Sequence, residues 1–118
     1  MDARPLKIGF GDESVSGLLL RPNDAKALYL FAHGAGAGMM HKAMESNAQG
    51  LAERGIATLR YQFPYMEKGS RRPDPPRIAH AAVRAAAAEA ARLVPELPLF
   101  AGGRSFGGRM TSQAQAET

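Results

Sequence analysis

The stretch that decides the fold lies near the carboxyl end and reads Leu97-Pro98-Leu99-Phe100-Ala101-Gly102-Gly103-Arg104-Ser105-Phe106-Gly107-Gly108. Residues 97–101 have the length and composition of a short buried strand. Two glycines end it, and the sequence predicts that a last helix begins near Phe106. Residues 103–107 fit the pattern G-x-S-x-G, which in this context places a serine on the sharp turn between a strand and a helix.

Such a turn has chemical consequences for the serine. The positions two residues before and after it have no room for side chains, so both are glycine. The turn lifts the hydroxyl of Ser105 above the sheet and leaves the amide of Phe106 at a helix N-terminus, free to meet an oxyanion. The pattern therefore predicts Ser105 as a nucleophile and the Phe106 N–H as an oxyanion donor. An ordinary glycine-rich joint without chemistry is the alternative.

A second loop of small residues, His33-Gly34-Ala35-Gly36-Ala37-Gly38, follows the continuous apolar run at 27–32. Small residues allow the backbone to approach a carbonyl oxygen closely. We expect Ala35 to supply the second oxyanion N–H, with Gly36 as the second choice. The loop fails the dinucleotide pattern G-x-G-x-x-G, because Met39 takes the place of the third glycine, and it lacks the Gly-Lys pair of a phosphate-binding loop. A tight turn that binds nothing is the alternative.

The rest of the chain supplies alternating elements. Strands are predicted at 6–10 and 15–20 as a hairpin, then at 27–32 and 56–61. A helix is predicted over 42–54, closed by Gly55. Residues 62–76 are predicted to be a long surface loop, and Asp74 is expected to cap a helix that starts with Pro75 and ends near Leu93. The apolar stripe of that helix comprises Ala79, Ala82, Val83, Ala86, Ala90 and Leu93.

This order predicts an α/β fold with a mostly parallel sheet flanked by helices and an N-terminal hairpin, in one domain over residues 1–118. Ligands bind such sheets at the carboxyl ends of the strands, and both glycine-rich loops fall there. The chain has no cysteine and a net charge of +4. Most of its basic residues are scattered along the chain. No aromatic residues interleave with the one local cluster, Lys68, Arg71 and Arg72, as a platform for single strands would require, so we expect no nucleic-acid partner. No apolar run has membrane length, so we expect a cytoplasmic protein without a membrane partner.

The two loops, together with Arg60-Tyr61-Gln62-Phe63-Pro64-Tyr65, resemble small α/β-hydrolases of the dienelactone-hydrolase-like kind. The resemblance covers residues 28–112 and is closest to a bacterial group related to testis-expressed hydrolase-like proteins. It implies a serine hydrolase that acts on a small-molecule ester or related acyl bond, without a cofactor or metal. It also implies that Phe63 to Tyr65 border the substrate cleft, and that His33, Gly34 and Gly36 belong to the binding loop.

In this family the triad runs in the order serine, acid, histidine. After Ser105 the chain has one acid, Glu117, and no histidine. We therefore expect an N-terminal half that is inactive alone, whose last strand is an uncovered sheet edge. A non-catalytic interaction module is the alternative. Oligomeric state is left open.

Three further expectations concern the histidine, methionine and arginine side chains. His33 is expected to anchor its loop, His41 to start a helix in solvent, and His80 to lie on the polar side of its helix. Several methionines, Met39, Met40, Met44 and Met66, either line an apolar pocket or fill core gaps. Arg104 and Arg109 flank the serine and either attract an anionic substrate or are simply solvated.

Overall fold

The computed structural model describes residues 2–116 and contains five strands and four helices in this part of the chain. The strands are β1 (Arg4–Phe10), β2 (Glu13–Leu20), β3 (Ala27–Ala32), β4 (Ile56–Tyr61) and β5 (Leu99–Gly103). The helices are α1 (Lys42–Glu53), α2 (Pro64–Glu67), α3 (Pro76–Leu93) and α4 (Phe106–Ala116). The predicted strand at 97–101 thus begins two residues later and includes both glycines.

The strands form one mixed sheet in the order β1-β2-β4-β3-β5. The predicted hairpin is present, because β1 and β2 pair antiparallel around Gly11, and β2 also pairs antiparallel with β4. The other strands, β4, β3 and β5, run parallel to one another. Ala32 is in register with Tyr61 on one side and with Gly103 on the other, so the three parallel strands end side by side.

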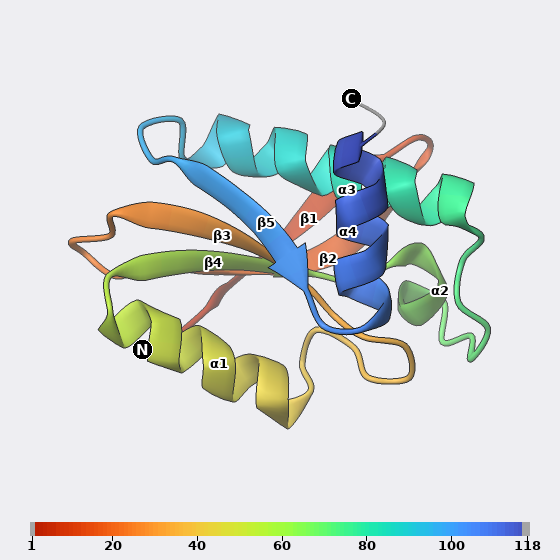
Figure 1. The fold of residues 1–118 in the computed structure, drawn as a ribbon, viewed down its shortest axis with the longest axis horizontal. Coiled ribbons are helices and arrows are strands. Elements are labelled where there is room, and N and C mark those ends of the chain that lie inside the picture. Colours follow the sequence, from red (N-terminus) through yellow and green to blue (C-terminus); the bar gives the residue numbers. More distant parts are fainter. Residues whose placement is uncertain (1, 117–118) are drawn as a thin grey trace.

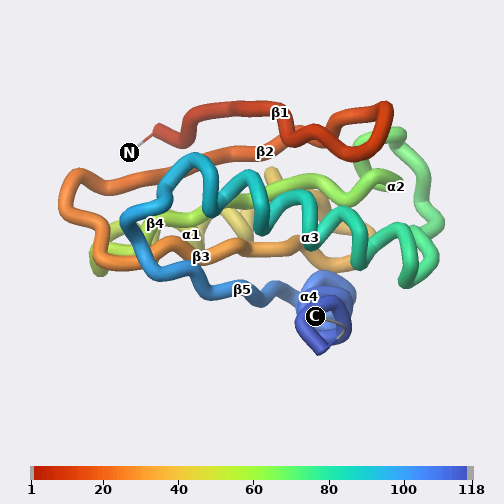
Figure 2. Tube along the Cα trace, turned by 90° about the horizontal axis from the view of Figure 1, so that it is seen from above, coloured from red at the N-terminus to blue at the C-terminus, as the bar shows by residue number. Residues whose placement is uncertain are grey.

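Helices cover both faces of this sheet, which confirms the predicted fold class. Figure 1 shows α1 on one face and α3 on the other, with α4 standing across the end of β5. The view in Figure 2 shows the same layers and places β1 and β5 at the two edges of the sheet. Burial of both faces explains why β3 is apolar without alternation.

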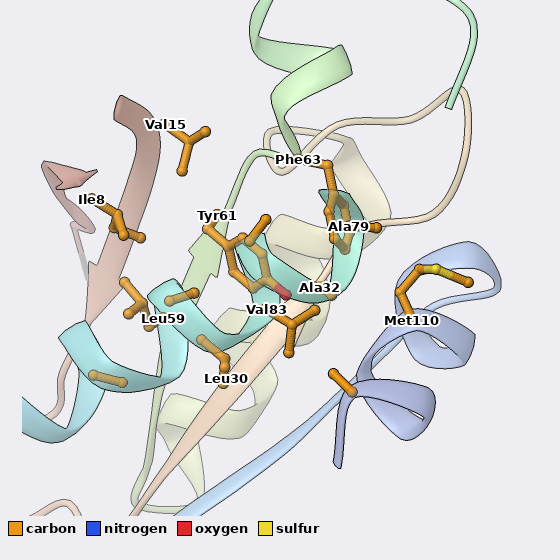
Figure 3. Close-up of a cluster of buried hydrophobic side chains, with 14 of the residues drawn as sticks. Ile8, Val15, Leu30, Ala32, Leu59, Tyr61, Phe63, Ala79, Val83 and Met110 are labelled. Carbon is orange, nitrogen blue, oxygen red and sulfur yellow. The ribbon is translucent and has the colours of Figure 1, made fainter. Parts of the chain in front are cut away.

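The main core lies between the sheet and α3. The predicted alanine stripe of α3 is buried from Ala79 to Ala90 and contacts Leu30, Leu59 and Tyr61 of the sheet (Figure 3). Small side chains on the helix let it approach the strands closely, and the larger residues of β3 and β4 fill the space between them.

Four predictions are corrected by the structure. Residues 62–76 are not simply loop, because they contain α2. Asp74 does not cap α3, whose N-cap is Pro75; its Oδ2 instead accepts a hydrogen bond at 3.1 Å from the N–H of Tyr65 in the first turn of α2. His80 is buried rather than on a polar face, with Nε2 2.9 Å from Oε1 of Gln113 on α4. The last strand was expected to be buried, but Leu99 and Phe100 of β5 are exposed, Phe100 to 60%. Within the described residues β5 is a sheet edge, as the expectation of an uncovered last strand had it.

Candidate active site

The strand order creates one place in the sheet where the connections leave in opposite directions. From β3 the chain crosses to β4 on one side through α1, and from β4 it crosses back over β3 to β5 through α3. The two connections use opposite faces of the sheet (Figure 1). A crevice is expected where the direction of winding reverses, at the carboxyl ends of β3 and β5. The two glycine-rich loops of the sequence lie at these two strand ends.

The turn at Ser105 is sharp and strained. Ser105 has a φ of +48°, and it is the one non-glycine residue with positive φ in residues 2–116. An L-residue in this left-handed conformation costs on the order of 1–2 kcal/mol. Hydrogen bonds hold the turn in place: the Arg104 N–H donates to the Ala32 carbonyl at 3.1 Å, and the Gly107 N–H donates to the Arg104 carbonyl at 2.9 Å. The strain is therefore imposed by the surrounding backbone.

The glycines around the serine are required by contact with the backbone of the neighbouring strand. A Cβ on Gly107 would lie 2.3 Å from the carbonyl oxygen of His33, and a Cβ on Gly103 would lie 2.6 Å from that of Ala32. Neither carbonyl can move without breaking β3. Close packing of α4 against the end of β3 thus depends on both positions, as the sequence pattern predicted.

The loop at 33–38 lies against the serine turn. The Cβ position of Gly34 is 3.6 Å from the Ser105 Cβ. Both loops, with the start of α1, surround a cavity of about 210 Å³ lined by Gly34, Ala35, Ala37, His41, Met44, Arg104 and Ser105. The hydroxyl-bearing residue and the expected donor Ala35 therefore share one cavity. Within residues 2–116, neither the Ala35 amide nor the Phe106 amide donates to another protein group.

Gly36 has a left-handed φ of +77° and lies outside the lining of this cavity. Its backbone lies near the Tyr65 hydroxyl instead and acts to lower the pKa of that phenol. Burial is the larger influence and raises the pKa of Tyr65 above its usual value. That Ala35 supplies the second oxyanion donor stays a prediction.

His33 is fully buried and uses both ring nitrogens to join two loops. Its Nε2 accepts a hydrogen bond from the Phe63 N–H at 3.0 Å, so Nδ1 carries the proton and donates to the Gly34 carbonyl at 2.8 Å. Burial lowers the pKa of His33 and favours this neutral form. With both nitrogens occupied, the ring cannot take a proton from Ser105, which matches its expected role as an anchor.

Phe63 and Tyr65 are buried under the cavity and do not line it. The Phe63 ring packs edge-on against His33, with centroids 5.0 Å apart, and against Phe106, with centroids 5.2 Å apart. Tyr65 contacts the same two rings. The structure thus brings His33, Phe63, Tyr65 and Phe106 together as a buried aromatic cluster. That Phe63 and Tyr65 border the substrate stays a prediction.

The other histidines are placed differently. His41 lines the cavity and caps α1, because its Nδ1 accepts from the Ala43 N–H at 3.1 Å. His80 lies between α3 and α4, away from the lining residues. Glu117 lies outside the described residues. Of the methionines, Met44 lines the cavity, Met39 is buried, Met66 packs against the core and Met40 is exposed.

The sequence interpretation missed a polar clamp beside the cavity. Arg60 is fully buried at the end of β4; its Nη1 donates to the Met39 carbonyl at 3.2 Å, and Nη2 pairs with the Glu45 carboxylate at 2.7 Å. The Gln62 Oε1 accepts from the Met39 N–H at 2.8 Å. An arginine inside an otherwise apolar strand was the signal for this clamp, because buried charges are normally paired.

Across residues 2–116, no three histidine or acidic side chains come together as metal ligands would. In the same part of the chain, no helix combines the length and apolarity needed to span a bilayer.

Comparison with known proteins agrees with this geometry. The model of the alpha/beta hydrolase domain family matches residues 25–118. A dienelactone hydrolase from Anabaena variabilis superposes with a TM-score of 0.83 at 25% identity, over 98% of this chain and 57% of its own. A serine hydrolase homologue from Coxiella burnetii gives 0.83 at 19% identity, over 100% and 59%.

A lidless α/β serine hydrolase from Xanthomonas campestris superposes with a TM-score of 0.81 at 20% identity, over 99% of this chain and 57% of its own. The chain thus spans a little under three fifths of the length of these structures. A comparison with curated proteins gave no match. Since the family model matches most of the chain, the protein belongs to the α/β-hydrolase family.

Proposed function

We propose that this chain carries the nucleophile and oxyanion hole of a serine hydrolase that cleaves an ester or related acyl bond. The observation that supports this most directly is the strained left-handed backbone of Ser105, at a cavity it shares with Ala35. Strain of this kind persists where the surrounding structure imposes it, and it gathers at functional sites. An ordinary strand-to-helix joint has no need of it.

In the proposed reaction, the Ser105 oxygen attacks the acyl carbon while its proton passes to a general base. The carbonyl oxygen becomes an oxyanion, which accepts hydrogen bonds from the Phe106 and Ala35 amides. Collapse breaks the bond to the leaving oxygen, which receives the proton from the base and departs as the alcohol. Water then hydrolyses the acyl-enzyme by the same steps. Removal of one oxyanion donor typically costs a factor of about 10²–10³ in rate.

Among residues 2–116, no carboxylate lines the cavity at Ser105 and no histidine is placed to take the serine proton. His33 is fully engaged, and His80 lies elsewhere. His41 uses Nδ1 to cap α1. The family order places the acid and the histidine after the serine. We therefore propose that the 118-residue chain by itself binds acyl substrates but turns them over very slowly, because a serine hydroxyl is a poor nucleophile without a base.

Chemical rescue tests this proposal on the chain as it stands. The protein is incubated with a fluorophosphonate probe, with and without added imidazole as an external base, and the labelled residue is identified by mass spectrometry. We expect slow labelling of Ser105 that imidazole accelerates, and no labelling at that position in Ser105→Ala. Ser112, an exposed serine on α4, serves as the internal control. Labelling of Ser105 no faster than of Ser112 would refute the proposal and favour a non-catalytic module.

A further inference from the structure

The two edges of the sheet differ in how they are protected. In the described residues, β1 and β5 each have a neighbouring strand on one side only (Figure 2). The strand β1 carries the charged residues Arg4 and Lys7 and also Pro5, which lacks an N–H, and such residues keep an edge from pairing. The strand β5 has the sequence LFAGG, without a charge or a proline, and its Phe100 is 60% exposed. The edge at β5 is therefore open to another strand.

The hydrogen bonds between β5 and β3 fix which backbone groups of β5 are free. The Pro98 carbonyl accepts from the Leu28 N–H at 2.9 Å, and the Arg104 N–H donates to the Ala32 carbonyl at 3.1 Å. In a parallel ladder, residues that bond to one neighbouring strand alternate with residues whose amide and carbonyl face the other side. The even-numbered residues of β5 thus bond to β3, and the odd-numbered residues, with Ala101 at their centre, face the open edge.

The side chains of β5 are complementary to a second copy of the same strand. If two copies pair antiparallel about Ala101, each bulky residue lies opposite a glycine: Leu99 opposite Gly103, and Phe100 opposite Gly102. On its two faces β5 borders hollows lined mainly by apolar residues, of about 470 Å³ beside α3 and about 250 Å³ beside α1. A strand paired at this edge lies beside both hollows, so the association buries apolar surface on each face of the sheet.

We propose that two copies of this chain associate through β5, antiparallel and centred on Ala101, to form one continuous sheet. The inference does not depend on the proposed function. Within the 118 residues no other segment competes for the edge, because the three residues outside the described part span at most about 10 Å, less than the length of β5. The second copy places its Leu99 opposite Gly103, so the interface borders the turn at Ser105.

Sedimentation equilibrium of the 118-residue chain tests the association. We expect a monomer–dimer equilibrium without larger species, because the pairing of two β5 edges leaves no open β5 edge for a third copy. Ala101→Pro removes the N–H at the centre of the pair and should raise the Kd of the dimer about tenfold or more. Ala101→Ser keeps this N–H and should leave the Kd within about twofold.

The register is tested with single cysteines, since the sequence contains none. In the proposed pair the two Ala101 Cα atoms lie about 5.5 Å apart, a separation that suits a disulfide. The two Leu99 Cα atoms are offset by four residues, about 14 Å along the strands, which a disulfide cannot span. Mild oxidation should therefore link A101C into a covalent dimer at least about tenfold faster than L99C.

The cysteine variants keep the test decisive even if Ala101→Pro fails to fold. Both cysteines lie on the same strand, and contact between apolar edges without a register would oxidise both at similar rates. Equal oxidation rates of A101C and L99C would overturn the inference. So would a chain that stays monomeric at millimolar concentration, or a folded Ala101→Pro that dimerises as tightly as the unchanged chain.

Discussion

Replacement of Ser105 by glycine should stabilise the protein relative to replacement by alanine. Both variants lose the hydroxyl, so the comparison isolates the backbone, whose φ is +48°. Alanine keeps the left-handed strain of on the order of 1–2 kcal/mol, and glycine relieves it. Glycine returns about 0.5–1 kcal/mol of this through its greater freedom in the unfolded chain. We expect Ser105→Gly to be more stable than Ser105→Ala by about 0.5–1 kcal/mol.

Urea denaturation followed by circular dichroism measures this difference, provided that the two variants have the same m-value. For a chain of this length, about 1 kcal/mol corresponds to a change in Tm of about 4 °C. Ser46 supplies the control, because it is exposed in the middle of α1. There Ser46→Gly should be less stable than Ser46→Ala by about 0.5–1 kcal/mol, the opposite sign.

The sign of the stability difference between Ser105→Gly and Ser105→Ala decides whether the backbone at this position is strained. If Ser105→Gly is no more stable than Ser105→Ala while the Ser46 pair behaves as expected, the backbone at 105 is not held in the left-handed region. The strained turn would then be wrong, and the proposed nucleophile would lose its main support.

Three further outcomes are expected. Gly107→Ala should cost at least about 3 kcal/mol in urea denaturation, since its Cβ meets a strand carbonyl, whereas Gly9→Ala, which has open space, should change stability by less than about 0.5 kcal/mol. Burial lowers the pKa of His33, so below about pH 6.5 the unfolded chain binds a proton that the folded chain does not bind. The free energy of unfolding should therefore decrease as the pH is lowered below that value, and it should decrease less steeply in His33→Asn. Phe100→Ser should reduce self-association in light scattering while changing stability little, because this side chain is exposed on an edge strand.

The sequence predicted the elements whose signals are local. The strand at 27–32 and the strand at 56–61 have the predicted bounds, and Gly55 follows α1 with a φ of +79°. Continuous apolar runs and a glycine stop depend on a few neighbouring residues, and this is why they can be read without tertiary information. The G-x-S-x-G pattern can also be read from a few neighbouring residues, although the contacts that require its glycines are with the distant backbone of Ala32 and His33.

The predictions that were wrong concern residues whose surroundings are set by segments far away in the sequence. Asp74 precedes a helix and has the right chemistry for its cap, but the Tyr65 amide, nine positions earlier, takes its carboxylate. His80 faces α4. The pattern of residues within α3 does not reveal that α4 packs over it. Phe100 is apolar in a short apolar strand, yet it is exposed because its strand lies at the sheet edge. Each outcome depends on which segments meet in space.

The buried aromatic cluster explains how two separate loops can form one site. Oxyanion donors act only when their spacing is fixed before the reaction, because movement during the reaction would cost the energy they are meant to supply. Phe106 follows Ser105 after β5, His33 opens the loop after β3, and the Phe63 ring packs edge-on against both. The His33 hydrogen bonds to Phe63 and Gly34 then fix the second loop against the first. These contacts tie together the strand ends that carry the two proposed donors, the amides of Ala35 and Phe106. If the proposed function is right, a polar residue in place of Phe63 should lower the rate of Ser105 labelling without touching either amide.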